Sequence, residues 1–104
     1  MAFSKAHLYT HEEQALSFFA RSISHPARPR IILDILECGP SYVEFLRQRH
    51  PLSQPAFVQH IEILRKSRLL EYEESTPFTF YSVQEKTLRH LIKQMQEFID
   101  LLNK

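Results

Sequence analysis

The sequence of 104 residues contains a single glycine, Gly39, and a single cysteine, Cys38. Phosphate-binding loops and dinucleotide-binding fingerprints need several clustered glycines, so nucleotide-binding enzymes of those classes are excluded. One cysteine excludes an internal disulfide and any multi-cysteine metal or iron–sulfur site. Scarce glycine also leaves few tight left-handed turns, which favours helices over a meandering sheet.

The chain also lacks long apolar runs and carries a net charge of only +1. No run approaches the roughly 20 apolar residues that cross a bilayer. Residues 1–19 lack the basic region, apolar core and cleavage site of a secretory signal. We therefore expect one cytoplasmic domain over residues 1–104, without membrane association. Because the net charge is near zero, any binding to a polyanion must come from local placement of charge.

A catalytic constellation is lacking as well. The only two aspartates, Asp34 and Asp100, fall on helix faces suited to solvent. No nucleophile, base and orienting group can be assembled from the serines, histidines and aspartates. We therefore expect the protein not to be an enzyme.

Hydrophobic periodicity predicts two helices in the first forty residues. Thr10 and Glu13 have capping-box spacing ahead of a helix over about residues 10–22. Pro26 fits the first turn of a second helix, which Gly39-Pro40 ends. The expected buried stripe of this second helix is Ile31, Ile32, Ile35 and Leu36.

Two further helices follow in close succession. Ser41 and Glu44 form a second capping box at the start of a short third helix, which His50-Pro51 breaks. Ser53 then caps a fourth helix, with Pro55 in its first turn. Two such helices across a four-residue turn predict a helix-turn-helix over about residues 41–67. The buried face of the fourth helix is expected to hold Phe57, Ile61 and Leu64.

After residue 70 the period of the hydrophobic pattern changes twice. Residues 70–83 alternate with period two around Ser75-Thr76-Pro77, which predicts a β-hairpin, or wing. From about residue 84 to residue 103 the period is helical again. Four helices, two strands and a helix make a mainly α (α+β) winged helix-turn-helix.

The last helix carries more apolar surface than a monomer of this size is expected to cover. Two adjacent stripes suit a helix that packs both on its own domain and on a partner helix. We therefore expect a homodimer that forms through the first and last helices, the alternative being that both stripes are simply core. The expected interface residues are Leu16, Phe19, Leu88, Leu91, Ile92, Met95, Phe98, Ile99 and Leu102.

Several segments, in their order and spacing, resemble the ArsR/SmtB family of winged-helix transcriptional repressors. The matching segments are Ser24–Arg28, Leu52–Arg65, Leu69-Leu70 and Phe80–Val83. The resemblance covers about residues 15–83 in motif and the rest in architecture. It implies a homodimer built from the first and last helices, with two recognition helices presented to successive major grooves of double-stranded DNA.

In such proteins the N-terminal part of the recognition helix enters the major groove. Here Gln54 and Gln59 can pair with adenine, and Val58 can cover a thymine methyl group. Ser53 and His60 match the family's serine and histidine, and we expect them to contact phosphate or to hold the helix. The alternative for the two glutamines is solvated helix surface. The expected DNA-binding residues are Ser53, Gln54, Pro55, Val58, Gln59, His60, Arg47, Arg49 and Arg65.

The sequence departs from the family pattern at several positions. Val58 stands where serine is usual, and Arg68 replaces a common glycine. Glu71, Glu73 and Glu74 make the wing acidic where many relatives have arginines. Because an acidic wing repels phosphates, a second interpretation stays open: a protein–protein interaction module whose wing meets a basic partner.

The metal ligands of many relatives are missing too. Tyr42 and Glu44 stand about where a thiolate site would need two cysteines. A carboxylate–histidine site on the last helix could use Glu85, but Thr87, Phe98 and Leu101 occupy its other positions.

The remaining histidines and the cysteine suggest no site. His7 and His11 have a spacing that could bind zinc on a continuous helix, but Thr10 as the cap breaks that helix. The others, His25, His50 and His90, are expected to be isolated surface or boundary residues. Cys38 has no resolving cysteine and is expected to be a buried or inert thiol. We expect no metal and no cofactor, and the sequence points to no particular effector.

Overall fold

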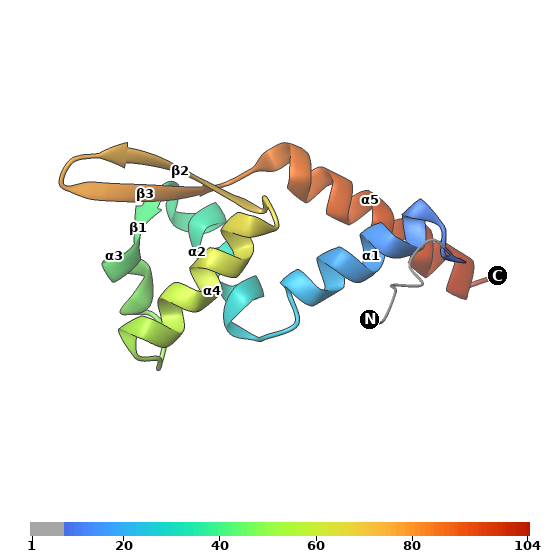
Figure 1. Ribbon diagram of the computed structural model, residues 1–104, viewed down its shortest axis with the longest axis horizontal. Coiled ribbons are helices and arrows are strands. Elements are labelled where there is room, and N and C mark those ends of the chain that lie inside the picture. Colours follow the sequence, from blue (N-terminus) through green and yellow to red (C-terminus); the bar gives the residue numbers. More distant parts are fainter. Residues whose placement is uncertain (1–7) are drawn as a thin grey trace, which may run out of the picture.

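The computed structural model describes residues 8–104, so His7 of the histidine pair lies outside the described residues. Figure 1 shows a body of helices with the hairpin at one end and α1 beside α5 at the other. The elements in chain order are α1 (His11–Ser22), α2 (Ala27–Cys38), β1 (Ser41–Tyr42), α3 (Val43–Arg47), α4 (Gln54–Lys66), β2 (Leu70–Ser75), β3 (Phe78–Val83) and α5 (Glu85–Leu102).

Side-chain caps fix the start of three helices. In α1 the Thr10 Oγ1 atom accepts from the Glu13 amide at 3.0 Å, and Glu13 Oε1 accepts from the Thr10 amide at 2.8 Å. The Ser53 hydroxyl caps α4, which has proline in its first turn. Gln84 caps α5, because its Oε1 atom accepts from the Thr87 amide at 2.7 Å. The capping box at Thr10 and the cap at Ser53 confirm the sequence-based predictions.

The predicted capping box at Ser41 is wrong. Ser41 and Tyr42 instead form the short strand β1, which pairs antiparallel with β3 opposite Tyr81 and Phe80. The Ser41 hydroxyl donates to the Gly39 carbonyl at 2.8 Å, and α3 begins at Val43 without a side-chain cap. Pairing with β3 instead satisfies backbone groups of Ser41 and Tyr42. The described residues therefore form three strands rather than two, in the order β1-β3-β2.

The core lies where α4 crosses α2 and meets the base of the hairpin. As predicted, Phe57, Ile61 and Leu64 of α4 are at most 1% exposed. They pack with Ile31, Ile32 and Ile35 of α2, and with Leu46, Leu69 and Leu70.

Two predictions for α2 are wrong, and both concern its buried arc. Leu36 is 52% exposed, whereas Asp34, expected at the surface, is 3% exposed. Asp34 lies three residues after Ile31 and one before Ile35, so the helical period places it on the same face as these core residues. The carboxylate is tolerated there because it has partners, which are described below.

The rest of the chain covers the helices α1 and α5 only in part. Phe19 and Leu91, each 5% exposed, join the core of the chain itself. The second half of α5 leaves a stripe of large apolar side chains in the open, comprising Ile92, Met95, Phe98, Ile99, Leu101 and Leu102. Among residues 8–104, no helix combines the length and apolar character that crossing a bilayer requires.

Candidate nucleic-acid interface

The N-terminal half of α4 presents an open face. Gln54, Pro55, Val58 and Gln59 are all exposed, while Phe57 on the opposite side is fully buried. This division follows from the helical period, because positions 54, 55, 58 and 59 share one side of the helix. The helix therefore projects two amides and one apolar side chain away from the core. Ser53, at the cap, is also exposed.

Behind this helix lies a buried contact between a histidine and an aspartate. The His50 Nε2 atom lies 3.3 Å from Asp34 Oδ2, and the two side chains are 4% and 5% exposed. The His50 ring also lies against Phe57, with centroids 5.0 Å apart. His50 is thus not isolated, and that part of the expectation is wrong, whereas the residue as a whole is half-buried, as expected of a boundary position. The position of Asp34 within the Ile31 and Ile35 stripe is the signal in the sequence that could have identified the pair.

His60 is held from α2 by Arg28. The Arg28 Nε atom donates to His60 Nδ1 at 3.1 Å, and Arg28 Nη1 donates to the Arg21 carbonyl at 3.0 Å. The His25 ring lies 4.2 Å from the His60 ring, centroid to centroid. His25 is therefore not isolated either.

These surroundings disfavour the protonated form of His60. Burial lowers the pKa of His60, and the nearby His25, Arg28 and His50 lower that pKa further. Since Nδ1 accepts a hydrogen bond, the ring proton of the neutral form lies on Nε2. The hydrogen bond from Arg28 joins His60 of α4 to α2, and a contact of His60 with phosphate stays a prediction.

The three arginines expected to meet phosphate all have partners within the chain. Arg47 forms two hydrogen bonds with Glu44, at 2.9 and 2.7 Å. Arg65 is paired with Glu62 at 2.8 Å and lies over the Tyr72 ring. The hydrogen bonds from these arginines lower the pKa of both glutamates.

Arg49 has a different set of partners. Its Nη1 atom donates to Cys38 Sγ at 2.8 Å, and its Nε atom lies 3.8 Å from the Asp34 carboxylate. Cys38 is exposed rather than buried. A phosphate would therefore meet Arg47, Arg49 or Arg65 only through the guanidinium N–H groups that these partners leave free, or after an exchange of partners.

The wing is acidic and partly aromatic. Glu71, Glu73 and Glu74 of β2 are exposed, and none of them forms an ion pair with another described residue. Phe78, at the start of β3, is 47% exposed and packs on Tyr42 with ring centroids 4.7 Å apart. The side chains of the hairpin therefore offer no positive charge to a phosphate.

Metal ligands are not brought together in the described part of the chain. Across residues 8–104, no three His, Cys, Asp or Glu side chains form a group that could hold a metal ion. His90, also expected to be isolated, is exposed and packs edge-on against Phe19, with centroids 5.5 Å apart.

Comparison with known proteins points to one functional class. No protein-family model matches the sequence. The transcriptional repressor SdpR of Bacillus subtilis (strain 168) is 29% identical over 80 residues, which is 77% of this chain and 88% of SdpR.

Solved structures agree with that likeness. A possible transcriptional regulator for arsenical resistance is similar with a TM-score of 0.68 and 25% identity, over 81% of this chain and 82% of that one. An ArsR-like transcriptional regulator from Rhodococcus sp. RHA1 gives a TM-score of 0.73 at 17% identity, over 90% and 88% of the two chains. The chain therefore has the winged helix fold of these regulators, and its sequence is similar to that of a transcriptional repressor.

Proposed function

We propose that the chain is a homodimeric transcriptional repressor that binds an inverted repeat in DNA and represses by occupying it. The observation that carries this proposal is the open face of α4, which presents Gln54, Val58 and Gln59 beyond the core. Each glutamine amide can pair with both the N6 and N7 atoms of adenine, and Val58 can cover a thymine methyl group. No chemical step is needed for repression, and the cytoplasm is where such a repressor meets its operator.

The proposed dimer uses the exposed stripe on α5. Ile92, Met95, Ile99 and Leu102 recur at spacings of three and four residues, which matches a seam between two packed helices. A two-fold axis at this seam would present the two copies of α4 to half-sites about 34 Å apart. Leu88 lies one helical turn before Ile92 on α5, and Leu16 is half-buried on α1, while Phe19 and Leu91 are buried in the core of each copy.

The test is fluorescence anisotropy of the protein on the DNA upstream of its own gene, against a scrambled duplex, at two salt concentrations. Specific binding that weakens with salt supports the proposal, because phosphate contacts release counterions. Equal and weak binding to both duplexes contradicts it.

A variant separates reading of bases from general attraction to DNA. Gln59→Ala should weaken binding to the operator by about 1–3 kcal/mol, the worth of one bidentate contact with a base. Its affinity for the scrambled duplex should not change. Gln96→Ala, on the distant helix α5, serves as the matched control and should leave both affinities intact. Equal losses on both duplexes for Gln59→Ala would contradict base reading.

The acidic wing favours one alternative function, a module that binds a basic protein partner. Glu71, Glu73 and Glu74 are exposed without ion-pair partners among the described residues, beside the exposed Phe78. Such a module would show no preference for operator DNA, and Gln59→Ala would leave its partner binding unchanged. A pull-down with the wild type and with Glu71→Lys/Glu73→Lys distinguishes it, because only the wing variant should lose the partner.

A further inference from the structure

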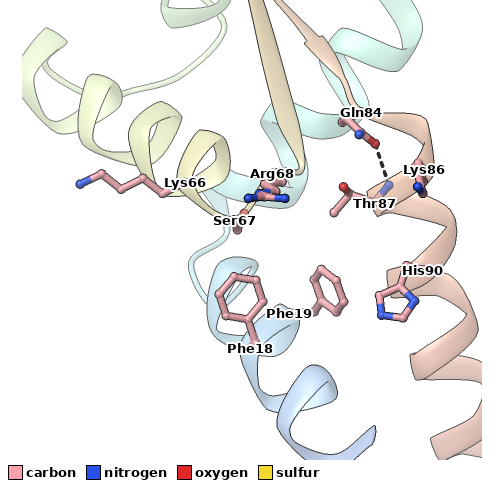
Figure 2. Close-up of a pocket in the computed structure, with 9 residues that line it drawn as sticks. All are labelled: Phe18, Phe19, Lys66, Ser67, Arg68, Gln84, Lys86, Thr87 and His90. Atoms are coloured by element: carbon pink, nitrogen blue, oxygen red, sulfur yellow. Dashed lines mark hydrogen bonds between the residues drawn. The ribbon is translucent and has the colours of Figure 1, made fainter. Parts of the chain in front are cut away.

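A cavity of about 450 Å³ lies where the end of α4 meets α1 and the start of α5. Figure 2 shows Phe18 and Phe19 on one side of it, with Arg68 and Thr87 opposite. The two phenylalanine rings meet edge to face with centroids 5.6 Å apart, and His90 extends this aromatic wall. Its volume falls within the range of about 300–1,000 Å³ found for small-molecule sites.

The other wall of the cavity is basic. Lys66, Arg68 and Lys86 line it, and none of them forms an ion pair with a described residue. No acidic side chain is among the described residues that line it. In Figure 2 the Arg68 guanidinium extends across the upper side, Lys86 lies at the margin beyond Thr87, and the Lys66 side chain points away from the phenylalanine rings. Most other arginines of the described chain already hold a carboxylate or a backbone carbonyl.

Two neighbouring polar groups are already occupied. The Ser67 hydroxyl donates to the Leu64 carbonyl, and the Gln84 side chain caps the Thr87 amide. The polar chemistry left for a ligand is therefore mainly cationic, and it faces an aromatic surface. A guanidinium suits a planar anion in particular, because it can donate two parallel hydrogen bonds to a carboxylate.

We propose that this cavity binds a small organic carboxylate with an apolar or aromatic body. The body packs on Phe18 and Phe19, and the carboxylate pairs with Arg68, with Lys66 and Lys86 adding positive charge. Neither half of the site suffices alone, since a neutral aromatic leaves the cations unpaired and an inorganic anion leaves the aromatic wall exposed.

The position of the cavity couples it to the recognition helix. Ser67 and Arg68 follow α4 directly, and the Gln84 amide donates to the Leu69 carbonyl at 2.9 Å, which links the end of α4 to the start of α5. A bound carboxylate would bridge α1, α4 and α5 and so change the affinity of the protein for DNA. Because such coupling is reciprocal, bound DNA would change the affinity of the protein for the carboxylate by the same factor. This coupling rests on the proposed function, whereas binding of the carboxylate does not.

The test titrates the full chain, without DNA, with naphthoate, whose own fluorescence reports binding. Naphthamide, which has the same shape and no charge, is the matched neutral compound. Naphthoate should bind about tenfold more tightly than naphthamide, the worth of a charge-assisted hydrogen bond. Equal affinity for the two compounds would overturn the proposal.

Variants locate the site. Arg68→Gly should weaken naphthoate binding about tenfold and leave naphthamide unchanged. The variant should fold, because Arg68 has φ 66, a region that glycine adopts freely. Arg68→Lys should recover only part of the binding, because an ammonium group cannot donate two parallel hydrogen bonds to a carboxylate, and Phe18→Ala should weaken both compounds. Lys93→Gln, exposed on α5 outside the cavity, is the charge control and should change neither.

Naphthoate binding that is the same in Arg68→Gly as in the wild type would overturn the site. Binding that responds to Arg68 while operator affinity stays unchanged would overturn only the coupling. Loss of operator binding in the absence of naphthoate bears on the proposed function and leaves the cavity test intact.

Discussion

At the scale of single residues, the most consequential pair is Asp34 and His50 under the recognition helix. Replacing Asp34 by Asn removes the charge while keeping the shape, and leaves the buried His50 with a weaker partner. We expect the free energy of unfolding to fall by about 1–3 kcal/mol, the usual cost of disturbing a buried charged hydrogen bond. Denaturant unfolding measures this.

The second aspartate provides the control. Asp100 is exposed on α5 and accepts a hydrogen bond from Gln96 at the surface. Asp100→Asn should change the unfolding free energy by no more than about 0.5 kcal/mol. Similar losses for the two variants would show that burial of Asp34 contributes nothing.

His60 gives the protein a dependence on pH in the mildly acidic range. Its pKa is lower in the folded chain than the value of about 6.5 for a free histidine. The unfolded chain therefore takes up the proton first as the pH falls. The contribution of neutral His60 to the stability of the folded chain is therefore complete above about pH 6.5. It is lost as the pH falls toward the lower pKa of the folded state.

Unfolding measured at about pH 7.5 and about pH 5.5 should therefore show a smaller free energy at the lower pH. His60→Gln should reduce this difference, since glutamine does not titrate. A variant whose pH dependence matches that of the wild type would contradict the assignment to His60.

At the scale of elements, the sequence-based predictions succeed where the signal comes from residues close together in the chain. The caps at Thr10 and Ser53 and the stripe Phe57, Ile61 and Leu64 depend on neighbours within a few residues, and all are confirmed. Ser41 has the same local signal, yet it became a strand because β3, forty residues later, pairs with it. A partner that distant leaves no trace in the spacing around Ser41.

The candidate site divides in the same way. The exposure of Gln54, Val58 and Gln59 follows from the helical period and was predictable. The contacts of His60 with Arg28 and His25 are not, because they join two helices whose relative placement the sequence pattern does not specify. The partners of Arg47 and Arg65 were predictable, because each arginine has a glutamate three residues earlier, a spacing that favours pairing on a helix.

The capping box of α1 makes a prediction about that helix as a whole. Thr10→Ala removes the acceptor for the Glu13 amide and should lower the unfolding free energy by about 1 kcal/mol. Thr10→Ser, which keeps the hydroxyl, should retain most of the stability. If thermal or denaturant unfolding does not distinguish Ala from Ser, the cap does not stabilise α1.

At the scale of the whole molecule, the exposed stripe on α5 predicts self-association. Ile99 is 44% exposed on that stripe. Ile99→Glu should convert a dimer into a monomer, because a buried unpaired carboxylate at the seam costs several kcal/mol. Sedimentation velocity at micromolar concentration measures the change.

The control for this variant is Lys93→Glu, an equally exposed charge change on the same helix but off the stripe. It should leave the dimer intact. A wild-type chain that sediments as a monomer at micromolar concentration would contradict the proposed seam.

Gln84 links the end of α4 to the start of α5 through two hydrogen bonds. Its backbone amide holds Leu69, just beyond α4, and its side chain holds the first turn of α5. Gln84 is thus a pivot for α5, whose 18 residues make an arm about 27 Å long. A tilt of about 10° at this pivot moves the far end of the arm by about 5 Å. In the proposed dimer, a shift of a few ångströms between subunits at the far end of α5 would therefore reach the α4 end as only a small rotation.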